Sequence, residues 1–123
     1  MDTYDAFTKH LALLSQGQEK DLTDIFICHG IVHIFMEQFD LAQQLFCQCL
    51  RRDGKGISAM GSAKEIIMAA YEEYLFVDED QWLRMLRDRN GQYEDGVSQC
   101  AARIIQQYTA VFAVLAKELK PAK

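Results

Sequence analysis

Hydrophobic side chains recur every three or four residues along most of the chain, which is the spacing of one face of an α-helix. No stretch alternates with a period of two, as a half-buried strand does, and the single proline is Pro121. The pattern predicts helices over about residues 2–14, 22–52, 62–75, 78–90 and 97–119. Because short connections favour antiparallel neighbours, we predict an all-α fold, an antiparallel up-and-down four-helix bundle with a short additional helix near one end.

The longest predicted helix, residues 22–52, has an unusually wide apolar surface. Its apolar positions form two adjacent stripes, which are Cys28, Val32, Phe35, Phe39, Ala42, Phe46 and Cys49 in one and Ile27, Ile31, Ile34, Leu41 and Leu45 in the other. One neighbouring helix covers less than this, so the helix is either central in the bundle or shared with a second subunit.

Start and stop signals delimit the later helices. Ser62 and Glu65 have the spacing of a capping box, in which each side chain accepts a hydrogen bond from the other residue's backbone amide. Asp78 is expected to cap the next helix, and Asn90-Gly91 is a strong helix stop. The last helix is predicted to bury one face, which consists of Ala101, Ile104, Tyr108, Val111 and Leu115, with Ile105, Phe112 and Leu119 beside it.

Length and composition predict an ordinary globular protein. With 123 residues, half of them apolar, we expect one domain covering residues 1–123. The acidic start lacks the features of a signal peptide, and no run approaches the roughly 18 apolar residues of a membrane span. We therefore expect a cytoplasmic protein without a membrane partner. In that reducing compartment the cysteines are expected to be buried apolar residues, namely Cys28, Cys47, Cys49 and Cys100.

The segment Trp82–Asp95 concentrates charge at the end of a predicted helix. Its candidate residues are Arg84, Arg87, Asp88 and Arg89. From the pattern alone we favour a solvated helix end, with surface ion pairs from Arg87 and Arg89 to Asp88, Glu94 or Asp95. The net charge of −5 argues against a large non-specific nucleic-acid footprint, although a local arginine cluster could still bind RNA or a nucleotide.

Other chemistry has little support in the sequence. His29, His33 and Glu37 lie on one helical stripe, as metal ligands in bundles do, but no Glu-x-x-His pair completes a di-metal site. No serine or cysteine lies in a nucleophile-elbow pattern, and Gly54-Lys55-Gly56 lacks the spacing of a phosphate-binding loop. We predict no metal, no other cofactor and no catalytic residue among these.

Two segments resemble the nucleotidyltransferase substrate-binding proteins of the HEPN superfamily, which are partners of minimal nucleotidyltransferases. Residues 30–42, Gly-Ile-Val-His-Ile-Phe-Met-Glu-Gln-Phe-Asp-Leu-Ala, are similar to the run Gly-Ile-Ile-x-Arg-Phe-Glu-x-x-Phe-Glu-Leu-Ala. Residues 82–90, Trp-Leu-Arg-Met-Leu-Arg-Asp-Arg-Asn, are similar to Trp-Leu-x-Met-Leu-x-Asp-Arg-Asn. The order of helices and the position of Ser62 also agree, so the resemblance covers about residues 5–119.

The resemblance implies a helical bundle that forms a homodimer and assembles with a minimal nucleotidyltransferase encoded nearby. Ribonuclease members use Arg-x4-6-His, often followed by x-Tyr, and the two side chains meet in the dimer cleft. In some pairs the nucleotidyltransferase silences the ribonuclease by adenylylating that tyrosine. Here Arg89 and Asn90 match, but Glu94 stands at the histidine position and Gly96 at the tyrosine position. A carboxylate repels phosphate and holds no proton to give near neutral pH.

The sequence therefore predicts a non-catalytic partner subunit that binds a minimal nucleotidyltransferase and helps to bind or present its nucleotide or other substrate. The alternatives are a HEPN-type ribonuclease toxin of a toxin–antitoxin pair, with residual activity from Arg89 and Glu94 or Tyr93, and a plain helical adaptor. The residues expected to line a cleft for nucleotide or RNA are Arg84, Arg87, Asp88, Arg89, Asn90, Tyr93, Glu94 and Asp40.

Overall fold

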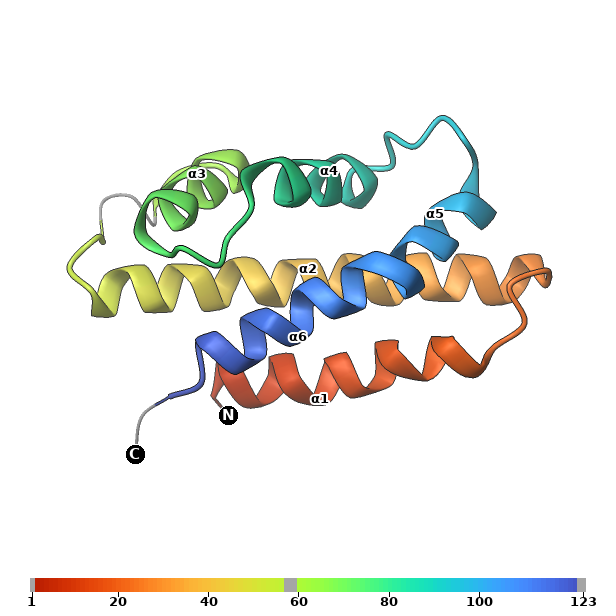
Figure 1. Ribbon diagram of the computed structural model, residues 1–123, viewed down its shortest axis with the longest axis horizontal. Coiled ribbons are helices and arrows are strands. Elements are labelled where there is room, and N and C mark those ends of the chain that lie inside the picture. The colour runs from red at the N-terminus through yellow and green to blue at the C-terminus, as the bar shows by residue number, and fades with distance from the viewer. Residues whose placement is uncertain (1, 57–59, 122–123) are drawn as a thin grey trace.

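The computed structural model describes residues 2–56 and 60–121, and within those ranges it contains helices and no strand (Figure 1). The all-α prediction is confirmed. η1 is a 3₁₀-helical turn, and η3 is a π-helical turn that joins α5 to α6 as one continuous helix. The elements in chain order are α1 Thr3–Ser15, η1 Gln16–Glu19, α2 Ile25–Arg52, α3 Ala63–Glu73, α4 Glu79–Arg89, α5 Val97–Arg103, η3 Ile104–Tyr108 and α6 Thr109–Glu118.

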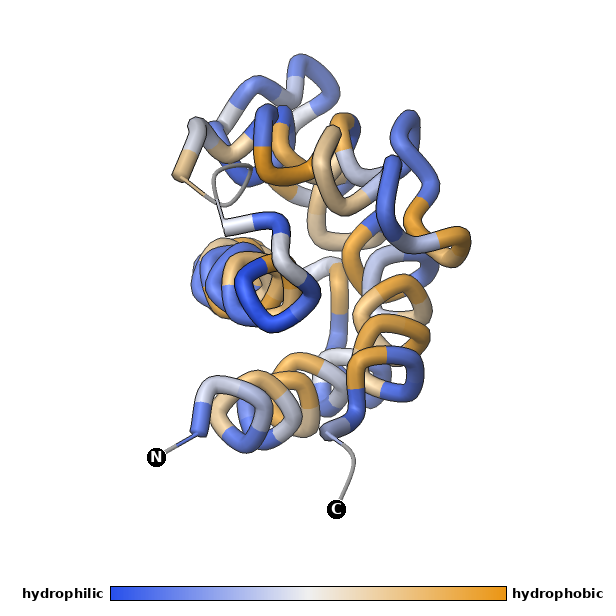
Figure 2. The backbone as a smooth tube through the Cα atoms, turned by 90° about the vertical axis from the view of Figure 1, so that its left-hand side faces the viewer, coloured by the Kyte–Doolittle hydropathy of each residue, from blue (hydrophilic) through white to orange (hydrophobic). Residues whose placement is uncertain are grey.

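The helices alternate in direction around one core. α2 runs the length of the molecule with α1 antiparallel along one side, and α3 and α4 follow each other along the other side (Figure 1). The helix formed by α5, η3 and α6 runs in the direction opposite to α4 (Figure 1). Figure 2, viewed from one end, shows this C-terminal helix beside the N-terminal helix, so it closes the bundle. The antiparallel bundle is thus confirmed, with α3 and α4 together taking the place of one long helix.

The apolar stripes of α2 explain its central position. Every residue of the stripe that runs from Cys28 to Cys49 is buried. In the second stripe Ile27, Ile34 and Leu41 are only partly buried. The first stripe therefore faces the bundle core, and part of the second lies at its outer edge.

α2 begins at Ile25, slightly later than the predicted start at residues 22–23, because of its cap. The Asp24 carboxylate accepts hydrogen bonds from the amides of Phe26 and Ile27, which fixes the first turn. By length and composition α2 is apolar enough to cross a membrane, contrary to our expectation from the sequence. This is a weak indication, because the core helix of a globular protein passes the same test, and α2 packs against α1, α3, α4 and α5.

Trp82 links three helices through aromatic contacts. It lies on α4 and is almost fully buried. Its ring centroid is 4.9 Å from that of Phe46 and 5.9 Å from that of Phe39, both on α2, and 5.9 Å from that of Phe112 on α6. Edge-to-face and tilted arrangements at these distances add to the free energy of burial. Trp82 therefore fixes the position of α4 relative to the core.

The predicted start of α3 is confirmed, and the helix ends slightly earlier than predicted. Ser62 and Glu65 form the capping box, with both reciprocal hydrogen bonds present. The helix ends two residues before Leu75, because Tyr74 adopts an extended backbone with φ −120° and ψ 121°. Its hydroxyl donates a hydrogen bond of 2.7 Å to Asp53 at the end of α2. That contact draws the chain away from the helix, and Leu75 is fully exposed.

Most of the predicted face of the last helix is confirmed. Its buried residues are Ala101, Ile104, Tyr108 and Leu115. In η3 the amide of Thr109 donates to the carbonyl of Ile104, a bond over five residues instead of four. The wider turn changes the phase of the helix. Beyond it Phe112, which we expected beside that face, is buried in the core, and Val111 is the residue of the predicted face that lies only at the edge of the core.

The cysteines largely follow the prediction. Cys28, Cys49 and Cys100 are buried, whereas Cys47 is only partly buried on α2. Burial, followed by the nearby charge of Asp88, raises the pKa of the Cys100 thiol to about 12. At neutral pH that thiol is protonated and behaves as a small apolar core residue.

Candidate functional site

A polar cavity of about 670 Å³ opens where α4 ends and α5 begins. Its volume lies within the range of roughly 300–1,000 Å³ that is typical of small-molecule sites. Five of the eight cleft residues expected from the sequence line it. The complete lining is Arg84, Arg87, Asp88, Gln92, Tyr93, Glu94, Asp95 and Arg103.

Asp88 is the fixed inner element of this cavity. It is 4 % exposed. Its carboxylate accepts hydrogen bonds from the Nε and Nη2 atoms of Arg103 at 3.0 and 3.1 Å and from the Tyr108 hydroxyl at 2.6 Å. A buried charge requires such partners, because an unpaired one is very costly in a low-dielectric interior. Asp88 is therefore a buried anchor and not the surface ion-pair partner that we expected.

Asp95 occupies the other edge of the Arg103 guanidinium. The Nη1 atom donates to one Asp95 oxygen at 2.5 Å and the Nη2 atom to the other at 3.3 Å. These bonds lower the pKa of Asp95, and the bonds to both carboxylates raise the pKa of Arg103. Arg103 thus joins one buried and one exposed carboxylate through two separate bidentate contacts.

The π-helical turn accounts for the convergence on Asp88. Arg103 and Tyr108 are five residues apart, and on a regular α-helix two such side chains point about 140° away from each other. The bond over five residues in η3 widens the turn between them. Both side chains thereby reach one carboxylate. Burial, followed by the hydrogen bond to Asp88, raises the pKa of the Tyr108 hydroxyl.

Arg84 and Arg87 provide the uncommitted positive charge of the cavity. They lie three residues apart on one face of α4, and both are exposed. Within residues 2–56 and 60–121 neither makes an ion pair. Our expectation that Arg87 pairs with a nearby acid is wrong, and both guanidinium groups are available to an anionic ligand.

Arg89 and Asp40 form a separate pair outside the cavity lining. Their two hydrogen bonds, both 2.9 Å, connect the end of α4 to the middle of α2. The predicted partners of Arg89 were the local acids, so that part of the prediction is wrong. Asn90, the eighth expected cleft residue, is the C-cap of α4, and its amide bonds to the carbonyls of the last helical turn.

Sequence reasoning missed Arg103 and Gln92 as lining residues and named Asp95 only as an ion-pair partner. One signal could have indicated the buried network. Asp88 continues the spacing of Trp82 and Met85 by a further three residues, which places a carboxylate on the buried face of α4. Such a carboxylate requires a cationic partner. The sequence alone does not identify that partner as Arg103.

The histidines lie elsewhere in the bundle. Glu37 contacts the Nε2 atom of His10 at 3.3 Å and that of His33 at 3.8 Å. The other ring nitrogen of His10 is 2.7 Å from the buried side chain of Gln38. In the part of the chain that the structure describes, no group of three or more His, Cys, Asp or Glu side chains is arranged to hold a metal ion.

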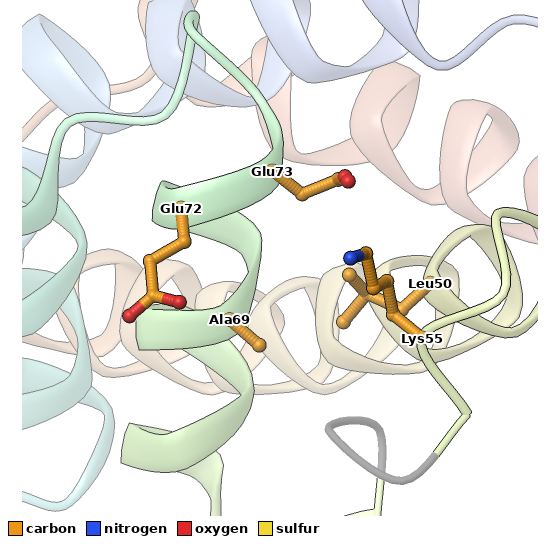
Figure 3. Close-up of a pocket in the computed structure, with 5 residues that line it drawn as sticks. All are labelled: Leu50, Lys55, Ala69, Glu72 and Glu73. Carbon is orange, nitrogen blue, oxygen red and sulfur yellow. The ribbon is translucent and has the colours of Figure 1, made fainter.

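A smaller cavity of about 220 Å³ lies between the end of α2 and α3. Figure 3 shows Lys55 and Glu73 pointing toward its space, whereas Glu72 turns away from it. Leu50 and Ala69 form its apolar wall. It contains none of the residues that we expected to line a cleft for nucleotide or RNA. We therefore regard the cavity at the end of α4 as the candidate site.

The structure defines the chain as an all-α helical bundle with a polar, arginine-containing cavity at one end. Comparison with protein families assigns this bundle to a family. The family described as nucleotidyltransferase substrate binding protein like matches residues 2–121, and the chain belongs to that family. Neither the curated proteins nor the solved structures contain a significant match to the chain.

Proposed function

We propose that this chain is a non-catalytic partner subunit that binds a minimal nucleotidyltransferase encoded nearby and helps to present the substrate of that enzyme. Membership of the family over residues 2–121 supports the partner role. The observation that carries the presenting role is the cavity at the end of α4, where Arg84 and Arg87 make no ion pair with any residue that the structure describes. The proposed ligand is the nucleotide or another phosphate-bearing substrate.

The lining of the cavity suits such a ligand. Arg84 and Arg87 each carry a planar guanidinium group, which can donate two parallel hydrogen bonds to two oxygens of one phosphate. Tyr93 is partly buried against the core, so its ring forms a fixed wall on which a base can stack. The wide opening fits a subunit that holds a substrate while the active site of a second protein acts on it.

Three features favour binding over ribonuclease activity. Arg89, the arginine of the ribonuclease motif, is already held by Asp40 through two hydrogen bonds. No histidine follows His33 in the sequence, so the cavity has no histidine for acid–base chemistry. Glu94 is an exposed carboxylate, which repels a phosphate diester. The ribonuclease toxin is therefore the second hypothesis.

We propose that the homodimer forms through the corner where α1 meets α2. Phe26 is 83 % exposed there and stands beside an apolar groove of about 170 Å³. Leu13, Ile27 and Ile34 are among the groove residues. A protruding ring next to an apolar groove on the same surface is self-complementary, as a two-fold interface requires. Exposed apolar surface of this kind marks protein interfaces.

Gly30 supports the same surface. It lies inside α2, where glycine costs about 1 kcal/mol relative to alanine. A Cβ atom at this position meets nothing within 4 Å, so packing within the chain does not require glycine. Close approach of a second copy of α2 does explain it.

We further expect the assembly to be cytoplasmic.

Co-expression with the nucleotidyltransferase encoded beside this chain tests the partner role. We expect the two proteins to co-purify as a complex of defined stoichiometry. Failure to co-purify, with both proteins folded, would contradict the proposed role. RNA degradation by the purified chain that disappears in Arg89→Ala would favour the ribonuclease hypothesis.

The presenting role has its own test. In the complex, Arg84→Gln with Arg87→Gln should weaken binding of the nucleotidyltransferase substrate by about tenfold or more, because two donors to phosphate are removed. The matched control is Lys64→Gln with Lys117→Gln, which removes the same charge from other helices and should leave that affinity unchanged. Equal effects of the two double variants would exclude the cavity as the substrate site.

A further inference from the structure

The guanidinium of Arg103 has two bidentate edges, and the structure uses them differently. The inner edge, formed by Nε and Nη2, holds the buried Asp88. The outer edge, formed by Nη1 and Nη2, holds Asp95, whose side chain is 48 % exposed. Both edges thus hold a carboxylate, but only the outer carboxylate can leave without creating a buried unpaired charge.

We propose that the outer edge of Arg103 is a phosphate-binding position and that Asp95 occupies it as an internal substitute until a phosphate takes its place. This inference rests on the proposed role of the cavity as a ligand site, and it adds to that role the anchoring residue and the chemical group recognised. A phosphate presents two oxygens with the same geometry as a carboxylate, so it fits the edge that Asp95 uses.

The segment that carries Asp95 can move without disturbing a helix. Gly91 and Gly96 flank it with φ values of 76° and 93°, in the left-handed region that glycine adopts without strain. Among the described residues, no backbone-to-backbone hydrogen bond involves residues 93–95. Tyr93 packs against the core at one end of this segment, and the contact with Arg103 holds Asp95 at the other end. Releasing the Asp95 contact therefore leaves Tyr93, α4 and α5 in place.

The charges of the cavity favour the exchange. Three arginines and three carboxylates line it, so it has no net charge while Asp95 is in place. Moving Asp95 into solvent leaves a surplus positive charge. Arg103 stays fixed, because Asp88 still holds its inner edge. A phosphate at the outer edge shares the cavity with Arg84 and Arg87, whose charges offset the remaining charge of a dianion.

Two alanine variants separate this exchange from a general charge effect. Asp95→Ala frees the outer edge of Arg103, and Glu94→Ala removes an equal charge from the same lining without touching Arg103. We expect Asp95→Ala to tighten binding of inorganic phosphate about fivefold, the ratio that corresponds to loss of a competing exposed ion pair. Glu94→Ala removes a repulsive charge that does not contact Arg103, so at physiological salt, where screening weakens that repulsion, it should tighten phosphate binding clearly less than Asp95→Ala does, by about twofold.

The measurement is a titration of the purified chain with inorganic phosphate, followed by NMR through the Nε–H signal of Arg103. Equal tightening in both variants, or weaker binding in Asp95→Ala, would overturn the inference. Thermal unfolding should show that both variants remain folded, which we expect because both side chains are exposed.

Titrations with AMP and adenosine distinguish the possible sources of the phosphate. AMP that competes with inorganic phosphate and binds more tightly assigns the position to a nucleotide, whereas equal affinities assign it to free phosphate. Adenosine that binds as well as AMP would overturn the inference. Because these titrations use the chain alone, they are independent of co-purification with the nucleotidyltransferase, so either proposal can fail while the other stands.

Discussion

Arg89 and Asp40 are joined by two hydrogen bonds of 2.9 Å, although 49 residues separate them in the sequence. The pair connects the last turn of α4 to the outer surface of α2. It therefore stabilises the position of α4, which supplies three residues of the cavity lining.

A double-mutant cycle with Arg89→Ala and Asp40→Ala measures this pair. We expect a coupling free energy of about 1 kcal/mol in urea unfolding, the upper value for a partly exposed pair with bidentate geometry. Each single variant should lower the free energy of unfolding by a similar amount. A coupling near zero would show that the contact does not contribute to stability.

The buried network is expected to contribute more. Asp88→Asn removes the charge that Arg103 and Tyr108 share, and it should lower the free energy of unfolding by about 3 kcal/mol. Tyr108→Phe removes one hydrogen bond to a charged acceptor and should cost about 1.5 kcal/mol. Urea unfolding monitored by circular dichroism gives both values. The reverse order of the two effects would contradict the anchoring role of Asp88.

Acid should destabilise the fold through a small set of carboxylates. Hydrogen bonds lower the pKa values of Asp53, Glu65, Asp21 and Asp95 in the folded chain. Since the unfolded chain then binds more protons, these groups stabilise the fold at neutral pH, and their contribution is lost as pH falls through the folded pKa values. We expect a constant melting temperature from pH 7 to about pH 5 and a fall below about pH 4. A melting temperature that rises toward pH 3 would contradict this assignment.

If the proposed dimer surface is right, Gly30→Ala has opposite effects on the stability of the monomer and on the affinity of the dimer. Gly30→Ala should raise the stability of the monomer by up to about 1 kcal/mol, through its helix propensity, and should weaken the dimer. Phe26→Ser should weaken the dimer by about tenfold or more, measured by analytical ultracentrifugation. The control is Leu75→Ser, which removes a fully exposed leucine from the connection between α3 and α4. Loss of the dimer in the Leu75→Ser variant would show that the interface includes the connection between α3 and α4, and it would contradict the proposed surface.

The sequence predicted the features that depend on local spacing. The capping box at Ser62, the stop at Asn90-Gly91 and the buried stripe of α2 follow from side chains a few residues apart, and each is present. α3 ends two residues earlier than predicted, where the Tyr74 hydroxyl donates a hydrogen bond to Asp53, a residue distant in sequence. Helix propensities contain no information on such a contact.

The site was predicted only in part for the same reason. Most of the lining residues of α4 and of the segment after it were predicted because they lie within the charged segment that begins at Trp82. Arg103 was missed because its two carboxylates lie 15 and 8 residues away in the sequence. Tyr108, the other partner of Asp88, lies at the end of a π-helical turn that the sequence does not reveal. Long-range pairing of charges and the phase of a helix beyond a π turn are both set by tertiary packing.

The number of residues in the π-helical turn determines both the contact of Tyr108 at the cavity and the packing of α6 at the other end of the bundle. Beyond η3, α6 buries Phe112 and Leu115, and the carbonyl of Ala116 accepts a hydrogen bond of 2.6 Å from Tyr4 on α1. Each residue advances an α-helix by about 100°. Deletion of a single residue within 104–108 would therefore turn α6 by about that angle and would separate Tyr108 from Asp88 at the same time. The length of this turn is under two constraints, one from the hydrogen bond of Tyr108 to the buried Asp88 and one from the closure of the bundle against α1.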